Sequence, residues 1–166
     1  MNAVLLERAR QVAEAVPDPE LPMLTLADLG VLRGVDVGVD GRVEVAITPT
    51  YSGCPALAEM RADLARSLAD AGFSDVRVRV ELSPPWSSDW ISPRGRAALK
   101  EAGISPPGPA PRRTRAIELG PIRRALACPR CGSDDVETVS EFGATACKAL
   151  CRCRACREPF EHVKEI

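Results

Sequence analysis

Two pairs of cysteines near the C-terminus are the residues whose types and spacing are best suited to chemistry. Cys128 and Cys131 form one Cys-x2-Cys motif, and Cys153 and Cys156 form a second. Each motif turns two thiolates toward one point, so together they supply the four tetrahedral ligands that zinc prefers, at about 2.3 Å per bond. Iron is also held by four thiolates, so the spacing predicts a metal site without choosing between zinc and iron.

Three further residues of metal-binding type lie in the same region. Cys147 and Cys151 exceed a four-ligand set, and we favour small core or surface thiols for them because free cysteine packs well as a hydrophobe. The alternative is an extra ligand pair for a transferable iron or cluster. His162, the only histidine, lies in a charged tail, so we expect it to be solvated rather than ligating. A single histidine excludes a histidine-rich catalytic metal site.

The remaining cysteine, Cys54, lies where a strand is expected to pass through a glycine turn into a helix. Unpaired N–H groups and the helix dipole stabilise a thiolate at such a place, which favours a nucleophilic or metal-binding thiol. Thr48 and Thr50 could donate hydrogen bonds to it, and Asp18 and Glu20 could approach as carboxylate ligands. A buried cysteine of structural value fits the local sequence equally well, and solvated loop charges are the commoner case for the two acidic residues.

The elements that must position these residues can be read from the hydrophobic pattern. Apolar spacing predicts two helices, residues 3–15 and 55–71, and alternation predicts three strands, residues 31–39, 43–48 and 75–82. Asp40-Gly41 is a strong signal for a hairpin between the first two strands. The order helix, strand, strand, helix, strand predicts a compact α+β sandwich.

Three segments follow from this pattern. Residues 1–92 form the α+β sandwich, and residues 93–127 form a linker rich in proline and arginine with a short helix. Residues 128–166 form a four-cysteine ribbon resembling zinc ribbons. The ribbon is too short to be held together by apolar burial, so its folding should depend on the metal.

Composition narrows the class of protein. No long apolar run is present and the first residues include charges, so we expect neither a membrane span nor a signal peptide, and a cytoplasmic location. Seven cysteines in that reducing compartment favour metal or thiol chemistry over disulfides. The isoelectric point near 5.9 and the acidic N-terminal part argue against nucleic-acid binding. The composition is compatible with a homodimer.

Several motifs resemble known families. The first set resembles the SufT/MIP-type iron-sulfur assembly domain over residues 1–92: Asp18-Pro19-Glu20, Asp28-Leu29-Gly30-Val31, Thr48 and Gly53-Cys54-Pro55. With residues 49–56 and the segment Ser140–Leu150 added, the whole chain resembles the PaaD family, the D components of phenylacetyl-CoA epoxidase systems. Cys151 departs from that pattern, because an aromatic residue is usual there.

The resemblance implies a non-catalytic accessory subunit in aerobic phenylacetate degradation, where a di-iron monooxygenase epoxidises the ring of phenylacetyl-CoA. The partners implied are the oxygenase or reductase components, and the task implied is maturation of a di-iron or iron-sulfur centre. In this hypothesis Cys54 is the working thiol that transiently binds iron or a cluster, and the four ribbon cysteines hold a structural metal.

Two other hypotheses compete with this one. A zinc-ribbon nucleic-acid module, or a protein-docking module, would use the ribbon surface; the phosphate contacts would be Arg112, Arg113, Arg115, Arg123 and Arg124. A thiol enzyme would use Cys54 covalently, but no histidine is available as its base. Trp86 and Trp90 could contact a partner, and we favour the simpler role of anchoring their own segment.

Overall fold

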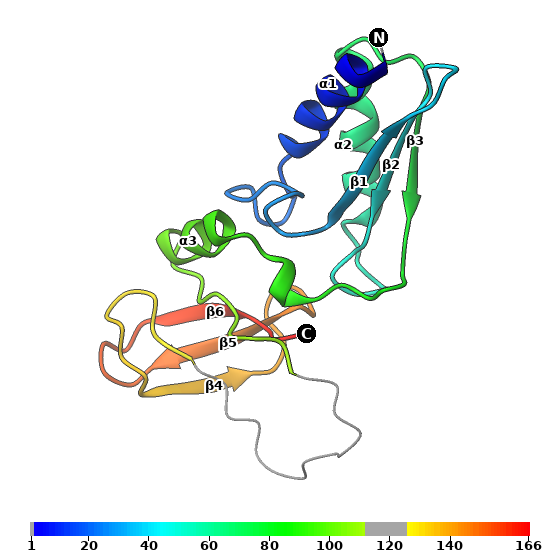
Figure 1. The fold of residues 1–166 in the computed structure, drawn as a ribbon. Coiled ribbons are helices and arrows are strands. Elements are labelled where there is room, and N and C mark those ends of the chain that lie inside the picture. Colours follow the sequence, from blue (N-terminus) through cyan, green and yellow to red (C-terminus); the bar gives the residue numbers. More distant parts are fainter. Residues whose placement is uncertain (1, 112–125) are drawn as a thin grey trace. The chain divides into compact units, whose positions relative to one another are not determined.

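The computed structural model describes residues 2–111 and 126–166 (Figure 1). It divides into two compact units, the first made of Met1–Trp86 and Trp90–Gly95 and the second of Ser87–Asp89 and Arg96–Ile166. The five arginines considered above as phosphate contacts, from Arg112 to Arg124, lie outside the described residues. Within the described part of the chain, no helix is both long and apolar enough to cross a bilayer.

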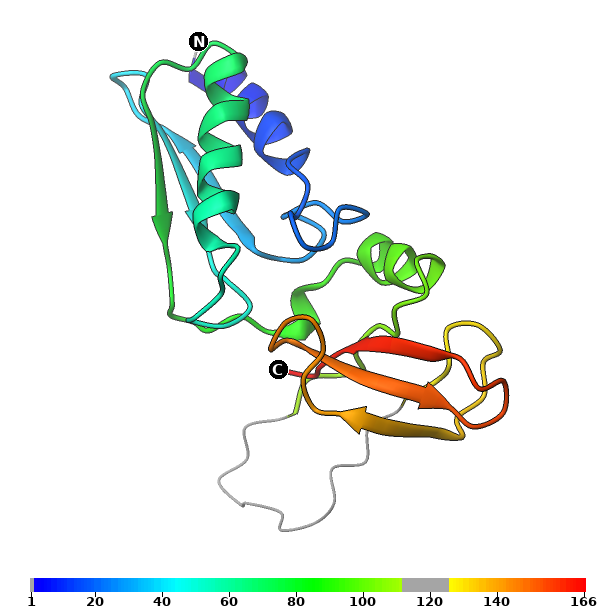
Figure 2. The same ribbon diagram turned by 180° about the vertical axis from the view of Figure 1, so that it is seen from behind.

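The first unit is a three-stranded sheet with two helices on one face. Its elements are α1 (Asn2–Glu14), β1 (Leu32–Val37), β2 (Val43–Ile47), α2 (Leu57–Asp70) and β3 (Val76–Val80). The strand order is β1-β2-β3, with β2 antiparallel to β1 and parallel to β3. Parallel neighbours need a crossover connection, which α2 supplies on the side where α1 also lies (Figures 1 and 2). The predicted α+β class and order of elements are confirmed.

The start of α2 differs from the prediction. We expected the helix to begin at Pro55, but its first residue is Leu57 and Ala56 occupies the N-cap without a side-chain hydrogen bond. The reason is a turn in which the N–H of Leu57 bonds to the carbonyl of Cys54 at 3.3 Å. Cys54 therefore precedes the helix by a turn instead of standing immediately before its first residue, which weakens the argument from the helix dipole because that effect is confined to the first turn.

Asp28, in the loop before β1, is a hydrogen-bonding centre of the first unit. Its Oδ2 accepts bonds from the N–H and hydroxyl of Thr25 at 3.2 and 3.1 Å. Its Oδ1 accepts bonds from the hydroxyl of Ser92 at 2.9 Å and from Nε of Arg94 at 3.0 Å. Burial alone would raise the pKa of Asp28, but these hydrogen bonds and the Arg94 charge together hold it below its usual value. The carboxylate thus joins the loop to residues 92–94.

The two tryptophans secure the same junction. Nε1 of Trp86 donates to the carbonyl of Leu29 at 3.0 Å. Trp90 packs on Gly30, where the φ of +73° and a distance of 2.6 Å from a hypothetical Cβ to Trp90 Cβ leave room only for glycine. The anchoring role expected for both tryptophans is confirmed, with the loop before β1 as the surface that receives them.

The second unit is a three-stranded antiparallel ribbon with the described end of the connector bonded to its edge. Its strands are β4 (Val136–Ser140), β5 (Lys148–Cys153) and β6 (Pro159–Val163), in the order β4-β5-β6. The helix α3 (Pro93–Glu101) precedes them. Ser105 then donates its N–H to Glu161 O at 2.8 Å and accepts from Val163 N at 3.0 Å, so the chain runs beside β6.

The expectation for His162 is wrong, because this side chain is completely buried rather than solvated. Its Nδ1 lies 3.2 Å from the hydroxyl of Ser105, and its Nε2 lies 3.1 Å from Oε1 of Glu165. The same Oε1 accepts the N–H of Gly108 at 3.0 Å. Burial alone would raise the pKa of Glu165, but the bonds from His162 and Gly108 lower it to about 2. The prediction of a solvated side chain failed because it considered only the charged neighbours in sequence, whereas residues 105–108 cover the histidine.

The Asp28 cluster leads to a pH-dependent prediction. Asp28→Asn should lower the free energy of unfolding of the first unit by about 1–3 kcal/mol at pH 7, because it loses several charge-assisted hydrogen bonds. The pKa of folded Asp28 lies below the value of 3.8 for an unperturbed group, so its contribution is complete above that pH and is lost as the pH falls through the folded pKa. The difference between variant and wild type should therefore shrink below about pH 4.

Tryptophan fluorescence during denaturant unfolding measures this, because both tryptophans of the chain belong to the first unit. The control is Asp75→Asn, whose carboxylate is 55% exposed and pairs with Arg42. It should change the free energy of unfolding by less than about 1 kcal/mol. Equal losses in the two variants would contradict the role given to Asp28.

Candidate metal centre

The structure brings the sulfurs of Cys128, Cys131, Cys153 and Cys156 together. The Sγ atoms of Cys128 and Cys156 are 3.7 Å apart, and those of Cys131 and Cys153 are 3.6 Å apart. All four sulfurs lie within 4.8 Å of one another. Cys128 and Cys153 are buried, whereas Cys131 and Cys156 are exposed. Each motif therefore contributes one inner and one outer sulfur.

The backbone around the first motif forms a closed turn. The N–H of Gly132 bonds to the carbonyl of Cys128 at 2.9 Å, and the N–H of Cys128 bonds to the carbonyl of Ser133 at 2.9 Å. Gly132 has a φ of +75°, and a Cβ placed there would meet no atom within 4 Å. Glycine at this position thus serves backbone conformation and not packing.

The second motif repeats the same turn with a different residue. The N–H of Arg157 bonds to the carbonyl of Cys153 and the N–H of Cys153 bonds to the carbonyl of Glu158, both at 3.0 Å. Arg157 has a φ of +68° and occupies the place of Gly132. An arginine in the left-handed region is strained by about 1–2 kcal/mol. The hydrogen-bonded turn therefore determines the backbone here against the preference of the side chain.

Electrostatics within the group favour a cation. A hydrogen bond from the N–H of Cys156, 3.5 Å from Sγ of Cys153, is the main cause that lowers the pKa of Cys153 to about 7. The pKa of Cys156 rises to about 12: a backbone hydrogen bond at Glu158 lowers it, but burial and the neighbouring sulfurs outweigh that bond. Four thiolates so close together repel one another, and a bound cation removes that penalty.

The two surplus cysteines lie apart from this group. Cys151 is completely buried in the ribbon core with Ala149 and Phe160. Cys147 is also buried, and its sulfur lies 3.1 Å from the hydroxyl of Thr145. In the described ranges, neither belongs to the sulfur group that could hold an ion. Their positions agree with the interpretation that they are small packing residues.

The residues proposed around Cys54 come from two loops. Cys54, Thr48 and Thr50 are all buried in the segment between β2 and α2. Asp18 is buried in the loop after α1, where its Oδ1 accepts the N–H groups of Glu20 and Leu21 at 2.9 and 2.8 Å. This arrangement shapes the proline loop, so Asp18 has a structural task that its sequence position did not reveal. The side chain of Glu20 is partly buried.

Sequence reasoning missed three contributors near these sites. Arg157 could have been found by comparing the two motifs position by position, because it stands where the first has glycine. Asp28 stood out only as part of a family motif, although Thr25 three residues earlier is a signal for a turn closed by side chains. The burial of His162 could not be found locally: Glu165 is only three residues away, but Ser105, whose hydroxyl lies 3.2 Å from its Nδ1, is 57 residues away.

Comparison with known proteins gives matches to both parts of the chain. A family model described as iron-sulfur cluster assembly protein matches residues 7–82, and one described as PaaD zinc beta ribbon domain matches residues 114–164. A crystal structure of a domain of unknown function (DUF59) from Bacillus anthracis covers 59% of this chain and 93% of its own, with a TM-score of 0.55 and 26% identity.

Two curated relatives bear on the family. The Fe-S protein maturation auxiliary factor YitW of Bacillus subtilis is 32% identical over 100 residues, 60% of this chain and 97% of that protein. An Escherichia coli K12 protein, provisionally named as the D component of 1,2-phenylacetyl-CoA epoxidase, is 46% identical over 151 residues, 91% of this chain and 87% of the relative. That similarity extends over both units, and the chain belongs to the PaaD family of phenylacetyl-CoA epoxidase components.

Proposed function

We propose that this protein is a non-catalytic accessory subunit of a cytoplasmic phenylacetyl-CoA epoxidase system, where it assists maturation of the di-iron or iron-sulfur centre. The observation that carries the proposal is the joining, in one chain, of an iron-sulfur assembly domain and a four-cysteine ribbon. Similarity to a maturation auxiliary factor over the first unit supports the task, and similarity to an epoxidase component supports the system. The partners are then the oxygenase or reductase components.

The metal proposed for the four-cysteine group is zinc in a structural role. Bonds of about 2.3 Å in a tetrahedron place sulfurs about 3.8 Å apart. The separations of 3.6 and 3.7 Å in two sulfur pairs are close to that value, and all four sulfurs lie within 4.8 Å of one another, which suits a zinc ion. Cys128 and Cys153 are at once ligands and members of the ribbon core, so the metal and the core stabilise each other. Iron in the same four thiolates is the alternative.

Glycine variants test how the turns hold the metal. Gly132→Ala should weaken zinc binding several-fold, because alanine is strained by about 1 kcal/mol at positive φ. Arg157→Gly should strengthen binding or leave it unchanged, since it relieves the strain at the matching position. Competition with a chromophoric chelator measures both affinities.

The matched control is Gly41→Ala in the first unit. Gly41 has a φ of +82° and, like Gly132, no atom within 4 Å of a hypothetical Cβ. Its substitution should reduce the stability of the first unit and leave zinc affinity unchanged. If Gly132→Ala and Gly41→Ala affect zinc equally, the turn does not govern metal binding.

Cys54 is proposed as the thiol that holds or transfers iron or a cluster. Its support is the match of residues 7–82 to an iron-sulfur cluster assembly model, a span that includes Cys54. The thiol is only 8% exposed, so transfer requires the segment between β2 and α2 to move away from it. Thr48 and Thr50 lie in the same segment and are proposed to support the sulfur, with Asp18 and Glu20 as neighbouring carboxylates.

Metal and sulfide analysis of anaerobically purified protein tests this role. Cys54→Ser should lose iron or sulfide that the wild type carries, while the zinc content stays the same. Cys147→Ser is the matched control, because Cys147 is also 8% exposed and lies outside the four-sulfur group. Zinc alone in all three proteins would show that Cys54 binds no metal in the resting protein. It would favour an accessory role in which the protein acts by docking to a partner.

A further inference from the structure

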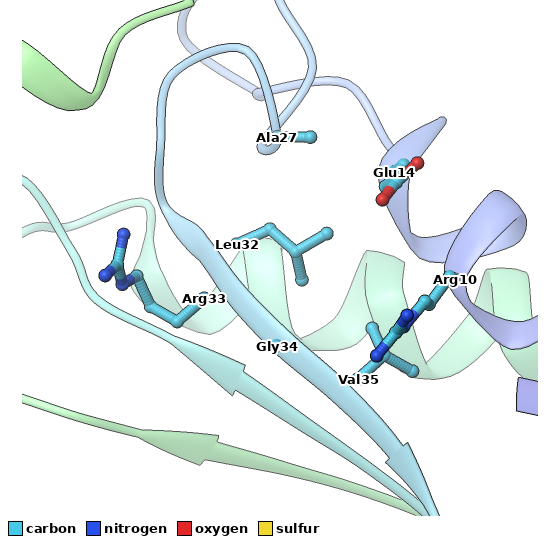
Figure 3. A pocket seen from close by; sticks show the side chains of 7 residues that line it. All are labelled: Arg10, Glu14, Ala27, Leu32, Arg33, Gly34 and Val35. Carbon is cyan, nitrogen blue, oxygen red and sulfur yellow. The ribbon is translucent and has the colours of Figure 1, made fainter. Parts of the chain in front are cut away.

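A groove runs along the outer side of β1 in the first unit, and no cysteine lines it. It has a volume of about 280 Å³ and is lined by Arg10 and Glu14 of α1, Ala27 of the preceding loop and residues 32–35 of β1 (Figure 3). A Cβ added to Gly34 would meet no atom within 4 Å, so space is open beside the strand. Neither the metal centre nor the segment of Cys54 uses this surface.

The lining shows that the groove faces a strand edge. Four consecutive residues of β1 contribute to it, whereas a pocket on one face of a sheet would contact alternate residues. In the described residues, β1 is an end strand whose paired neighbour is β2. The register shifts between Leu32 and Gly34, which leaves Arg33 as an extra residue in the ladder. The N–H of Leu32 is already bonded to the carbonyl of Leu26 at 3.0 Å, so the backbone groups that this edge presents to an added strand are those after Leu32.

Of the charged side chains that line the groove, Arg10 and Arg33 are basic and Glu14 is acidic, so the lining carries a net positive charge that favours an acidic occupant. Arg10 and Arg33 are exposed, and within the described ranges no carboxylate forms an ion pair with either. The guanidinium of Arg33 stacks 3.6 Å over the ring of Trp90, which is itself fixed against Gly30. A stacked guanidinium keeps the N–H donors at its edge available for a carboxylate.

The two arginines also stand on opposite sides of β1 (Figure 3). Side chains of an added strand alternate between its two faces, so two neighbouring residues of that strand would point to opposite sides. Adjacent acidic residues would thus reach one arginine each. A basic pair would meet Arg10 and Arg33 as like charges and be rejected.

We infer that the β1 edge binds an extended segment of a partner protein, which adds as a fourth strand and places two adjacent acidic residues between Arg10 and Arg33. Main-chain hydrogen bonds supply the affinity and the two ion pairs supply the selectivity. This recognition surface goes beyond the maturation role and does not depend on the metal content of the protein.

The test uses the full chain and a fluorescein-labelled peptide, acetyl-Ser-Val-Thr-Asp-Glu-Val-Thr-Ser amide, followed by fluorescence anisotropy. Wild type and Cys54→Ser should bind it equally. Arg10→Glu and Arg33→Glu should each raise Kd by about tenfold, because a charge pair is replaced by a repulsion. Arg77→Glu is the matched control: this arginine is exposed on β3, the opposite edge of the same sheet, and its substitution should leave Kd within about twofold.

Two further peptides separate charge from strand addition. Replacing Asp-Glu by Lys-Lys should abolish binding, and replacing the Val that follows Asp-Glu by Pro should do the same, because proline cannot donate to the ladder. Unfolding curves from tryptophan fluorescence establish that each variant with a substituted surface arginine is folded. The inference is overturned if the acidic peptide shows no saturable binding, if Arg77→Glu weakens binding as much as the groove variants, or if the proline peptide binds as well as the parent.

Discussion

The close approach of four cysteine sulfurs is the constraint on which the second unit depends. The apolar cluster of the ribbon consists of Cys128, Ala149, Cys151, Cys153 and Phe160, and two of these five are themselves members of the sulfur group. Packing that core therefore brings two sulfurs of the group together, and a bound cation would stabilise the four cysteines as thiolates. This unit has few large apolar side chains. We therefore expect metal coordination by the cysteines and burial of the apolar core to occur together, because the same residues take part in both.

The first unit is held together by an apolar core and by hydrogen bonds. Its sheet buries Val43, Val45 and Ile47 of β2 beneath a helix stripe of Leu64 and Leu68. Asp28 and the two tryptophans then join the residues after β3 to the loop before β1. This contrast agrees with a model in which the first unit is a stable scaffold and the folding of the second unit depends on metal.

Regular patterns could be predicted from the sequence, whereas interactions between distant residues could not. The four-sulfur group followed from Cys-x2-Cys spacing, because a metal imposes that spacing locally, and strand β3 followed from its strict alternation. The burial of His162 did not follow, because it requires a strand-like partner from residues 105–108. The start of α2 was misplaced by two residues, because a proline turn and a helix with proline at its first position look alike in sequence.

The duplicated turn has a consequence for the order in which the ribbon forms. Each motif closes through its own two backbone hydrogen bonds, so each can present two sulfurs before the other is in place. A metal ion would first bind the two sulfurs of one motif. Binding of the second motif to the same ion then closes a loop whose ends, Cys131 and Cys153, are 22 positions apart. The entropy of closing that loop grows only slowly with its length. Strands β4 and β5, which lie within the loop, can thus vary in length and hairpin shape over evolution while the four ligands stay the same.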